Sequence, residues 1–597
     1  MKRSLYAFFL VAGMPVVCSA DPYVGYIYPA GIQTGTTNRL IIGGQALNGA
    51  EKFHFTKSGL RVLKIEHVPG FPPPVGIQRR HLVKWLDGIA AGNRVEPQLP
   101  NDPHLDEWRA NSWWSALGTL DEGQLAIVEH DLYTPRNALQ ATPSLRQMVL
   151  VTVAADADAQ PGWRSLVGYG RGGISAPRPF EVTVAPHDAE PLYIPPHRKQ
   201  PEPTLADVRT KDAVLDGQIL PGSTDIFRLR LAAGKRYALK ATARELQPYI
   251  GDAVPGFFNP ILTLKDDNGN IVSVADDAER FRPDPILEYT SPKEGIYTLE
   301  IHDVLYRGRA DFVYTIAVGA AEKQSQRTAD GVVAKPGMVS TKKFTVSEPG
   351  LRVLEVTARR RGSPLDPVLT LRKASGGPAL ASWDDVTNTV FTGTVPQGEC
   401  DPIGLYDFTE PGEYVAEITD RTRHGGNSYV WWLEVRRPRP DFEVFSTRST
   451  LPMVNGQGVK VRFRIRRMDG FDGKVTIEVP SDIRIQNNVI TSGVDEVASF
   501  LTYKGTFGKE IQPIKLFASA TISGRTVRHP VMPCDEYEQA FAWKHLVPAE
   551  DFLFRGFPPP KKPGKPWYET IKLPPNHKKN PGKCLNCHSE KQLREHL

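Results

Sequence analysis

Cysteine is scarce in this chain, with five residues among 597. Two of them, Cys584 and Cys587, are separated by two residues and followed directly by His588, which makes a C-x-x-C-H pattern near the chain end. At this scarcity the pattern is expected by chance on the order of once in a thousand such sequences. There is no second C-x-x-C pair, which excludes a structural zinc site built from two closely spaced ligand pairs.

The common motifs of hydrolysis and nucleotide binding are also missing. The chain has no G-x-S-x-G elbow, no H-E-x-x-H helix and no Walker loop, and its fourteen histidines are scattered. A hydrolase needs a nucleophile or a metal constellation, and the sequence offers neither. It therefore predicts a protein that is not an enzyme.

Long apolar runs are absent after residues 1–20, so no segment of the mature chain is expected to span a membrane. The N-terminus has a basic start, an apolar run from Leu5 to Val17 and small residues before Asp21. This pattern is typical of a secretory signal peptide and predicts export to the periplasm or the cell surface. The alternative is lipoprotein acylation of Cys18, although a valine precedes it where a small residue is expected.

Proline and glycine are frequent, with 52 and 51 residues, and apolar residues make up 40% of the chain. This composition suits turn-rich β-domains better than helix bundles or disorder. A chain of this length forms several domains rather than one core. We therefore expect a mainly β fold of tandem β-sandwich, jelly-roll-like domains.

The first domain is predicted at residues 21–185. Strand patterns at its start and end enclose a segment with helical spacing, for example Leu82, Trp85 and Ile89. The pattern predicts a β-sandwich with a helical insertion at about 75–132. A linker rich in proline and charge follows at 186–203.

An internal repeat covers the middle of the chain. Asn259-Pro260-Ile261-Leu262-Thr263-Leu264 matches Asp366-Pro367-Val368-Leu369-Thr370-Leu371, and Asp276-Asp277 matches Asp384-Asp385. Later matches have a larger offset, which indicates an insertion in the second copy. A period of about 110 residues with alternating strands and turns predicts two β-sandwiches, at 204–320 and 326–437.

Both copies resemble pre-peptidase C-terminal (PPC) domains, which are accessory modules of secreted bacterial proteins. The phrases "YPAGIQTGTTNRLIIGGQAL" and "VTVAADADAQPGWRSLVGYGRGGISAPRPFEV" in the first domain are similar to the opening and closing strands of a module found in the same proteins. The resemblance implies a jelly-roll-like fold and a role in export, folding or surface binding. It implies no particular chemistry.

Aspartates cluster in both repeats. The candidate ligands for Ca²⁺ are Asp276, Asp277, Asp384 and Asp385, with Asp284, Asp303, Asp401 and Asp420 in the same clusters. Hard cations bind several carboxylate and carbonyl oxygens at once. The alternative is that these side chains form and cap turns, because no loop has the ligand spacing of an EF-hand.

A last β-domain is predicted at 441–550, with a closing amphipathic helix in "DEYEQAFAWKHLVPAEDFL". In its strand 459–465, apolar residues alternate with Arg462 and Arg464. Together with Arg466 and Arg467 these could form a nucleic-acid patch. Alternation with core residues favours a solvated strand face instead, so no nucleic-acid partner is expected.

Residues 551–597 hold ten lysines and arginines against four acids, whereas the rest of the chain has 63 of each. Eight prolines lie between Pro558 and Pro581. This predicts an extended, semi-rigid basic arm that carries the C-x-x-C-H pattern away from the body.

C-x-x-C-H is the attachment signature of a c-type haem. Cys584 and Cys587 are placed to form thioethers with the porphyrin, and His588 to ligate the iron from the proximal side. The resemblance to cytochrome c is limited to these five residues, and no methionine follows Cys587. We expect His577 as the distal ligand. The alternatives are His596, Met453 and a partner chain.

Cys400 and Cys534 remain once the haem has taken its pair, and an oxidising compartment favours a disulfide between them, with two buried free thiols as the alternative. The sequence as a whole predicts an exported protein with one covalent haem c that passes electrons to a redox partner in the envelope. The alternative is an envelope scaffold whose β-domains bind a protein or glycan.

Overall fold

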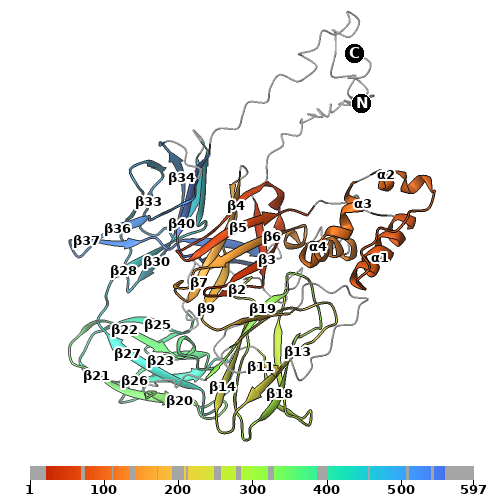
Figure 1. The fold of residues 1–597 in the computed structure, drawn as a ribbon. Coiled ribbons are helices and arrows are strands. Elements are labelled where there is room, and N and C mark those ends of the chain that lie inside the picture. Colours follow the sequence, from red (N-terminus) through yellow and green to blue (C-terminus); the bar gives the residue numbers. More distant parts are fainter. Residues whose placement is uncertain are drawn as a thin grey trace, which may run out of the picture.

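The computed structural model describes residues 22–68, 74, 76–110, 112–134, 142–170, 173–190, 208–209, 213–247, 257–276, 284–320, 328–385, 401–454, 458–505, 510–539 and 543–557. Within these ranges the chain is mainly β and forms a series of sandwich-like domains with one helical insertion (Figure 1). This confirms the predicted fold class. Among the described residues, no helix is long and apolar enough to cross a membrane.

The first domain is a sandwich of a four-stranded sheet, in the order β1-β3-β6-β5, and a five-stranded sheet, in the order β2-β9-β7-β4 with β8 paired to β7. Its elements are β1 (Tyr23–Tyr28), β2 (Gly31–Gln33), β3 (Thr37–Gln45), η1 (Leu47–Gly49), β4 (Ala50–Phe55), β5 (Leu60–Glu66), η4 (Pro143–Leu145), β6 (Gln147–Ala155), β7 (Gly162–Gly170), β8 (Gly173–Ile174) and β9 (Arg178–Thr183). Val149, Val151 and Val153 alternate along β6 and are fully buried against the second sheet. Because successive side chains of a strand point to opposite faces, the alternating valines all lie on the face of β6 that packs against the second sheet.

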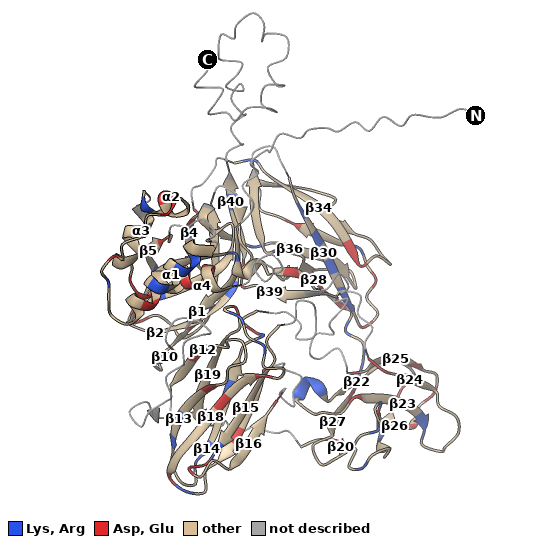
Figure 2. Cartoon of the chain, turned by 90° about the vertical axis from the view of Figure 1, so that its right-hand side faces the viewer, with Lys and Arg blue, Asp and Glu red and all other residues tan. Residues whose placement is uncertain are grey.

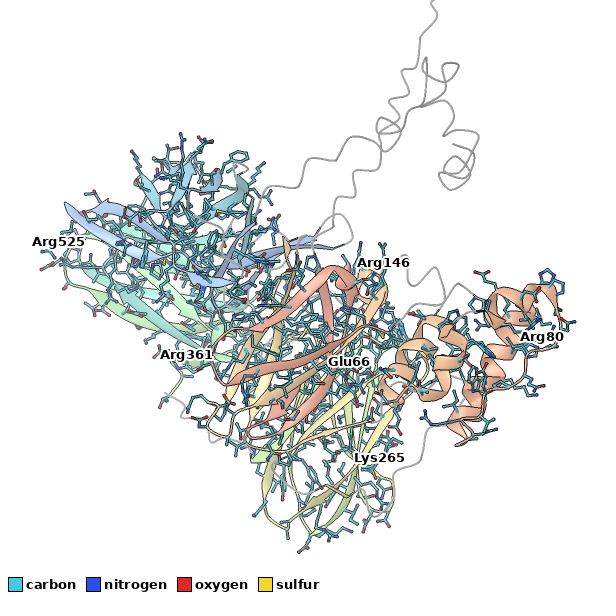
Figure 3. The ribbon with its side chains drawn as sticks, turned by 45° about the horizontal axis from the view of Figure 1, so that its top comes forward. Glu66, Arg80, Arg146, Lys265, Arg361 and Arg525 are labelled. Atoms are coloured by element: carbon cyan, nitrogen blue, oxygen red, sulfur yellow. The ribbon has the colours of Figure 1, made fainter. Side chains whose placement is uncertain are left out.

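The helical insertion lies between β5 and β6 and projects from the side of the first domain (Figure 1). Its elements are α1 (Gly76–Ala90), η2 (Pro103–Leu105), α2 (Asp106–Arg109), α3 (Ser112–Ala116), η3 (Leu117–Thr119) and α4 (Glu122–Tyr133). Trp85, Trp108 and Trp114 pack together in a core of its own. Asp121 caps α4 through a capping box with Gln124, which explains why that helix begins there. In Figure 3, the side chains of the insertion lie to the right of the β body.

The two repeats share a four-strand order in each sheet, and the first repeat has one additional edge strand in each, β10 and β11. The first repeat has β10-β12-β19-β14-β17 and β11-β13-β18-β15-β16, and the second has β20-β27-β22-β25 and β21-β26-β23-β24. First-repeat strands are β10 (His187–Ala189), β11 (Val208–Arg209), β12 (Val214–Gln218), β13 (Asp225–Leu231), β14 (Arg236–Thr242), β15 (Pro260–Lys265), β16 (Ile271–Ala275), β17 (Ile286–Thr290), β18 (Gly295–Asp303) and β19 (Val313–Ala320). Second-repeat elements are β20 (Gly331–Val332), β21 (Ser340–Val346), β22 (Gly350–Thr357), η6 (Arg359–Arg361), β23 (Pro367–Lys373), β24 (Ala381–Trp383), β25 (Ile403–Phe408), β26 (Gly412–Asp420) and β27 (Val430–Arg436).

The C-terminal domain is all β within the described residues. Its strands are β28 (Asp441–Ser446), β29 (Thr450–Val454), β30 (Val459–Met468), β31 (Val475–Glu478), β32 (Ile483–Gln486), β33 (Val489–Ile490), β34 (Glu496–Tyr503), β35 (Gln512–Ile514), β36 (Phe517–Ile522), β37 (Arg525–Pro530), β38 (Cys534–Gln539), β39 (Trp543–Pro548) and β40 (Phe552–Phe557).

The predicted closing helix is wrong. β38 and β39 form an antiparallel hairpin in its place. Leu546 of β39 packs with Cys534 of β38 and with Phe445 of β28, so burial against the domain overrides the local helix propensity of the segment. The predicted boundary at 550 is also wrong, because β40 pairs with β29 and β35 inside this domain.

The first domain packs against two other domains. Tyr26, Ile41 and Leu150 share a buried cluster with Leu246 and Val313 of the first repeat. On the other side, a second cluster joins its residues to the C-terminal domain, namely Val167, Tyr169, Ile174, Ile511 and Leu553. The body is therefore held together by side-chain packing as well as by the chain.

Candidate functional site

The predicted haem residues Cys584, Cys587 and His588 lie outside the described residues, as do His577, the signal peptide and the basic arm from Pro558 on. Haem attachment therefore stays a prediction from the sequence. Met453, one of the alternative distal ligands, is fully buried in the core of the C-terminal domain. A buried core methionine would have to leave its packing to ligate an iron on the arm.

The predicted aspartate clusters divide into two groups. In the first group, the carboxylate of Asp284 accepts hydrogen bonds from the backbone N–H groups of Ala243, Arg244 and Glu245, at 2.7–3.1 Å. The carboxylate of Asp401 does the same for Ala358, Arg359 and Arg360 in the second repeat, at 2.9–3.1 Å. Both side chains are buried, so their oxygens are committed to the turn.

Asp303 and Asp420 form a second equivalent pair. Asp303 accepts the N–H of Asn259 at 2.9 Å, and Asp420 accepts the N–H of Asp366 at the matching position, also at 2.9 Å. Each also accepts a bond from the turn that follows it, from Leu305 and from Thr422 respectively. The turn-forming alternative is thus correct for these four aspartates.

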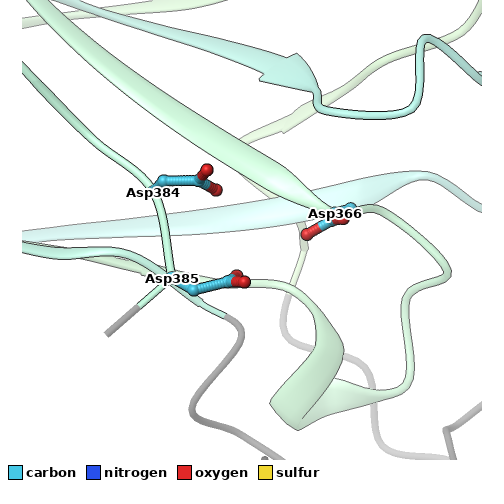
Figure 4. Close-up of side chains that lie close together, drawn as sticks. All are labelled: Asp366, Asp384 and Asp385. Carbon is cyan, nitrogen blue, oxygen red and sulfur yellow. The ribbon is translucent and has the colours of Figure 1, made fainter. Parts of the chain in front are cut away.

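The second group contains the predicted calcium ligands. Asp384 and Asp385 follow β24 and point toward Asp366 at the start of β23 (Figure 4). One carboxylate oxygen from each of the three lies within 4.8 Å of the others. In the first repeat, Asp276 is exposed and Asp277 lies outside the described residues. The calcium ligands predicted from the sequence therefore included two residues of this cluster, Asp384 and Asp385, but not Asp366.

The electrostatics of this cluster are mixed. Arg421 pairs with Asp384, and Arg359 Nη2 lies 3.3 Å from Asp366 Oδ2. The Oδ1 atoms of all three carboxylates are buried and have no hydrogen bond to a described residue. Burial raises the pKa of Asp366, opposed by the charge of Arg359, and burial and then the charge of Asp366 raise the pKa of Asp385. The charges of Asp420 and Asp401 also act on Asp366, and a hard cation could balance such an acidic cluster.

The arginines of β30 are used within the C-terminal domain. Val461, Phe463 and Ile465 face its core, as predicted. Basic residues colour part of β30 blue in Figure 2. On the face opposite the core, Arg462 and Arg464 pair with Glu536 of the hairpin, so this face is partly covered rather than fully solvated. Arg466 pairs with Glu443, and Arg467 lies near Asp472. Because each of these arginines has an acidic partner nearby, little of their positive charge is left to bind nucleic acid.

Cys534 is a free thiol, 1% exposed, at the start of β38. The predicted disulfide with Cys400 is therefore wrong for Cys534, and its alternative of a buried thiol is correct there. Cys400 itself lies outside the described residues. Burial and then the charge of Asp535 raise the pKa of the Cys534 thiol to about 12, so it is unreactive in the folded protein.

Arg178 was not singled out from the sequence, yet it joins two domains. Its guanidinium donates to the carbonyl of Gly25 at 3.0 Å and to the hydroxyl of Tyr23 at 3.3 Å. It also donates to the hydroxyl of Tyr537 on β38. At 2% exposure it is one of the largest fully buried side chains. No periodic or motif signal marks an arginine that becomes buried only when two domains meet.

Comparisons with known proteins give no family. No family model matches the chain, and no curated protein matches it. Solved structures with distant similarity include Dpr2 Ig1-Ig2 in complex with DIP-Theta Ig1-Ig3, at 10% identity and a TM-score of 0.13, covering 53% of this chain and 95% of that one. The fibronectin(III)-like modules of Clostridium thermocellum CbhA match at 14% identity and a TM-score of 0.11, covering 40% and 98%. The ICAM-5 D1-D4 ectodomain fragment matches at 10% identity and a TM-score of 0.11, covering 87% of this chain and 98% of that one. Scores this low carry no argument about function.

Proposed function

We propose that this chain is an exported, non-enzymatic protein that carries one covalent c-type haem on its basic C-terminal arm and passes electrons in the cell envelope. The observation that carries the proposal is the pattern Cys584-Leu585-Asn586-Cys587-His588. Two thiols at this spacing suit the two vinyl groups of one porphyrin, and the adjacent imidazole suits its iron. The signal-peptide pattern supports the proposal, because c-type haem is attached after export.

The arm would deliver the haem to a partner. Its excess of lysine favours a redox partner with an acidic docking surface, since opposite charges steer encounter. The β-domains would support this arm and would contribute no catalytic residue.

The decisive experiment is haem staining of the purified full-length protein on a denaturing gel. We expect the wild type to stain and the double variant Cys584→Ala with Cys587→Ala to lose the stain, because only thioether-linked haem survives denaturation. Leu585→Ala with Asn586→Ala is the matched control, since it changes the same loop and keeps every ligand. Staining that persists without both thiols would disprove the covalent assignment.

A second candidate is an envelope scaffold for a protein or glycan. It is favoured by the packing of the first domain against both its neighbours, which makes a broad rigid body. Reduction and reoxidation of the haem by an envelope redox protein would support electron transfer. A haem that binds such a protein without exchanging electrons would support docking instead.

A further inference from the structure

Three exposed apolar residues follow one another at one end of the first repeat. They are Val304, Leu305 and Tyr306, in the turn after β18, and their exposed fractions are 36%, 68% and 54%. Single apolar residues are common on protein surfaces, whereas a contiguous exposed apolar group can mark a binding surface. We call these three residues the apolar tip.

The second repeat forms the same turn from polar residues. Asp303 and Asp420 each pair with the first residue of the neighbouring strand, at the same register, so residues 304–306 correspond to residues 421–423. The third residue of each turn has a positive φ, 52° in the first repeat and 60° in the second. The second turn reads Arg-Thr-Arg where the first reads Val-Leu-Tyr. The shape of the turn therefore does not require apolar side chains, and their presence in the first repeat calls for a contact.

The four backbone N–H groups of residues 304–307 all have acceptors inside the first repeat. Those of Leu305 and Arg307 donate to Oδ2 of Asp303 at 3.0 and 3.1 Å, and the one between them donates to the carbonyl of Asp303 at 2.8 Å. The first of the four donates to the carbonyl of Asn259 at 2.9 Å. Because an unpaired backbone group is costly in an apolar medium, a turn whose donors are already paired can enter such a medium without that cost.

The charges next to the apolar tip cancel in pairs. The tip itself has no charged side chain. Behind it, Nε of Arg307 lies 2.9 Å from Oδ2 of Asp303, and Nε of Arg309 lies 2.9 Å from Oδ1 of Asp311. Opposite charge would therefore not draw a charged partner to the tip, whereas a zwitterionic lipid surface, which has no net charge either, is complementary to it.

The ring of Tyr306 is held by a second ring beneath it. It stacks on His302 of β18, with the ring centroids 4.5 Å apart and the planes 3° apart. Tyrosine has an apolar ring and a polar hydroxyl, and it is enriched at the level of lipid headgroups. Leucine instead gains by burial below that level. The pair Leu305-Tyr306 thus suits the boundary between headgroups and acyl chains.

We propose that the apolar tip is a membrane contact that inserts into the headgroup boundary of a lipid bilayer. Leu305, the most exposed of the three residues, enters the acyl region, and Tyr306 stays at the level of the headgroups. The contact is peripheral and reversible, because three side chains bury little area compared with a lipid anchor. It needs only residues of the first repeat and is independent of the haem proposed for the arm.

The test is sedimentation of the full-length protein with phosphatidylcholine vesicles, which have no net charge. We expect binding that persists at high salt, because burial of apolar side chains is not screened. The double variant Leu305→Thr with Tyr306→Arg gives the turn the residues of the second repeat and should weaken binding by about tenfold or more, the effect of losing a buried apolar side chain. Ile271→Thr is the control, since it changes an apolar residue that is 62% exposed at the other end of the same sheet, and it should bind like the wild type.

Equal binding by the double variant and the wild type would overturn the proposal. Binding that requires anionic vesicles and disappears at high salt would also overturn it, and would assign the contact to the basic arm. A wild type that binds neither kind of vesicle would overturn it as well, and would leave the tip to a protein partner. If the double variant does not fold, Leu305→Thr alone replaces it, with weaker binding to neutral vesicles as the expected result.

Discussion

Asp284 and Asp401 hold the same turn in the two repeats, each through three successive backbone N–H groups. Asp401→Ala leaves those three donors without their acceptor, and the N–H of Ala358 is fully buried. We expect this to destabilise the second repeat by about 3 kcal/mol. Hydrogen exchange in β22 and β25 would measure the loss. Asp407→Ala, at an exposed position on β25, is the control and should change little.

Arg178 should hold the first domain against the C-terminal domain. Arg178→Ala removes donors from Gly25 and Tyr537 at a buried interface, and we expect about 3 kcal/mol less protection in β9 and β38. Exchange of those strands is the measurement. Arg525→Ala removes an exposed arginine and serves as the control (Figure 3). Equal effects of the two changes would show that the interface does not depend on Arg178.

His577 is the expected distal ligand of the proposed haem. It lies on the arm before Pro581 and Gly582, which allow the chain to turn. His577→Ala should convert a low-spin spectrum to high-spin, while His596→Ala leaves it low-spin. A bis-histidine site should also have a lower potential than a His/Met site. The opposite pattern in the two variants would assign the position to His596.

Cys534 should resist alkylation in the folded protein. Its pKa of about 12 leaves almost no thiolate at pH 8, and burial blocks access. Mass spectrometry should find the thiol unlabelled before unfolding and fully labelled after it, without added reductant. A peptide that bridges Cys534 to Cys400 would contradict this.

Calcium at the cluster of Asp366, Asp384 and Asp385 is tested by heating the protein with and without the ion. Binding to the folded state alone raises the unfolding temperature with ligand concentration. We expect millimolar Ca²⁺ to raise the temperature at which the second repeat unfolds, and Asp385→Asn to remove that increase. Asp407→Asn is the exposed control. A wild type that is indifferent to Ca²⁺ would leave the cluster as an ion-pair network with Arg359 and Arg421.

The repeats could be predicted because their signal is local. A strand such as Pro367–Lys373 has its apolar residues two apart, and the Asp-Pro start and the paired aspartates recur at nearly constant spacing. The helical insertion was predictable for a similar reason, since Leu82, Trp85 and Ile89 lie on one face of α1. Each of these patterns is complete within about twenty residues.

What the sequence could not predict depends on distant contacts. The hydrogen bond between Arg178 and Tyr537 joins residues 359 apart, and no local pattern marks either of them. The glutamates, alanine and lysine of the segment that forms β38 and β39 favour a helix, so its sequence predicts one. The hairpin forms instead because it buries Leu546 against the domain. Asp366 was part of the repeat motif but not of the ligand set, because its closeness to Asp385 arises only when β23 and β24 pair.

The four domains form a closed ring, because the chain runs from the first domain through the two repeats to the C-terminal domain, which packs back on the first domain. Glu510 joins Lys52 and Tyr169, and Arg555 of β40 donates to the carbonyl of Gly170 at 3.3 Å. A pull between the first strand and the arm would therefore load this interface before it stretches either repeat. The ring also constrains assembly, because the first domain cannot complete its surface until β40 has folded, and Arg555 of that strand lies 385 residues after its partner Gly170.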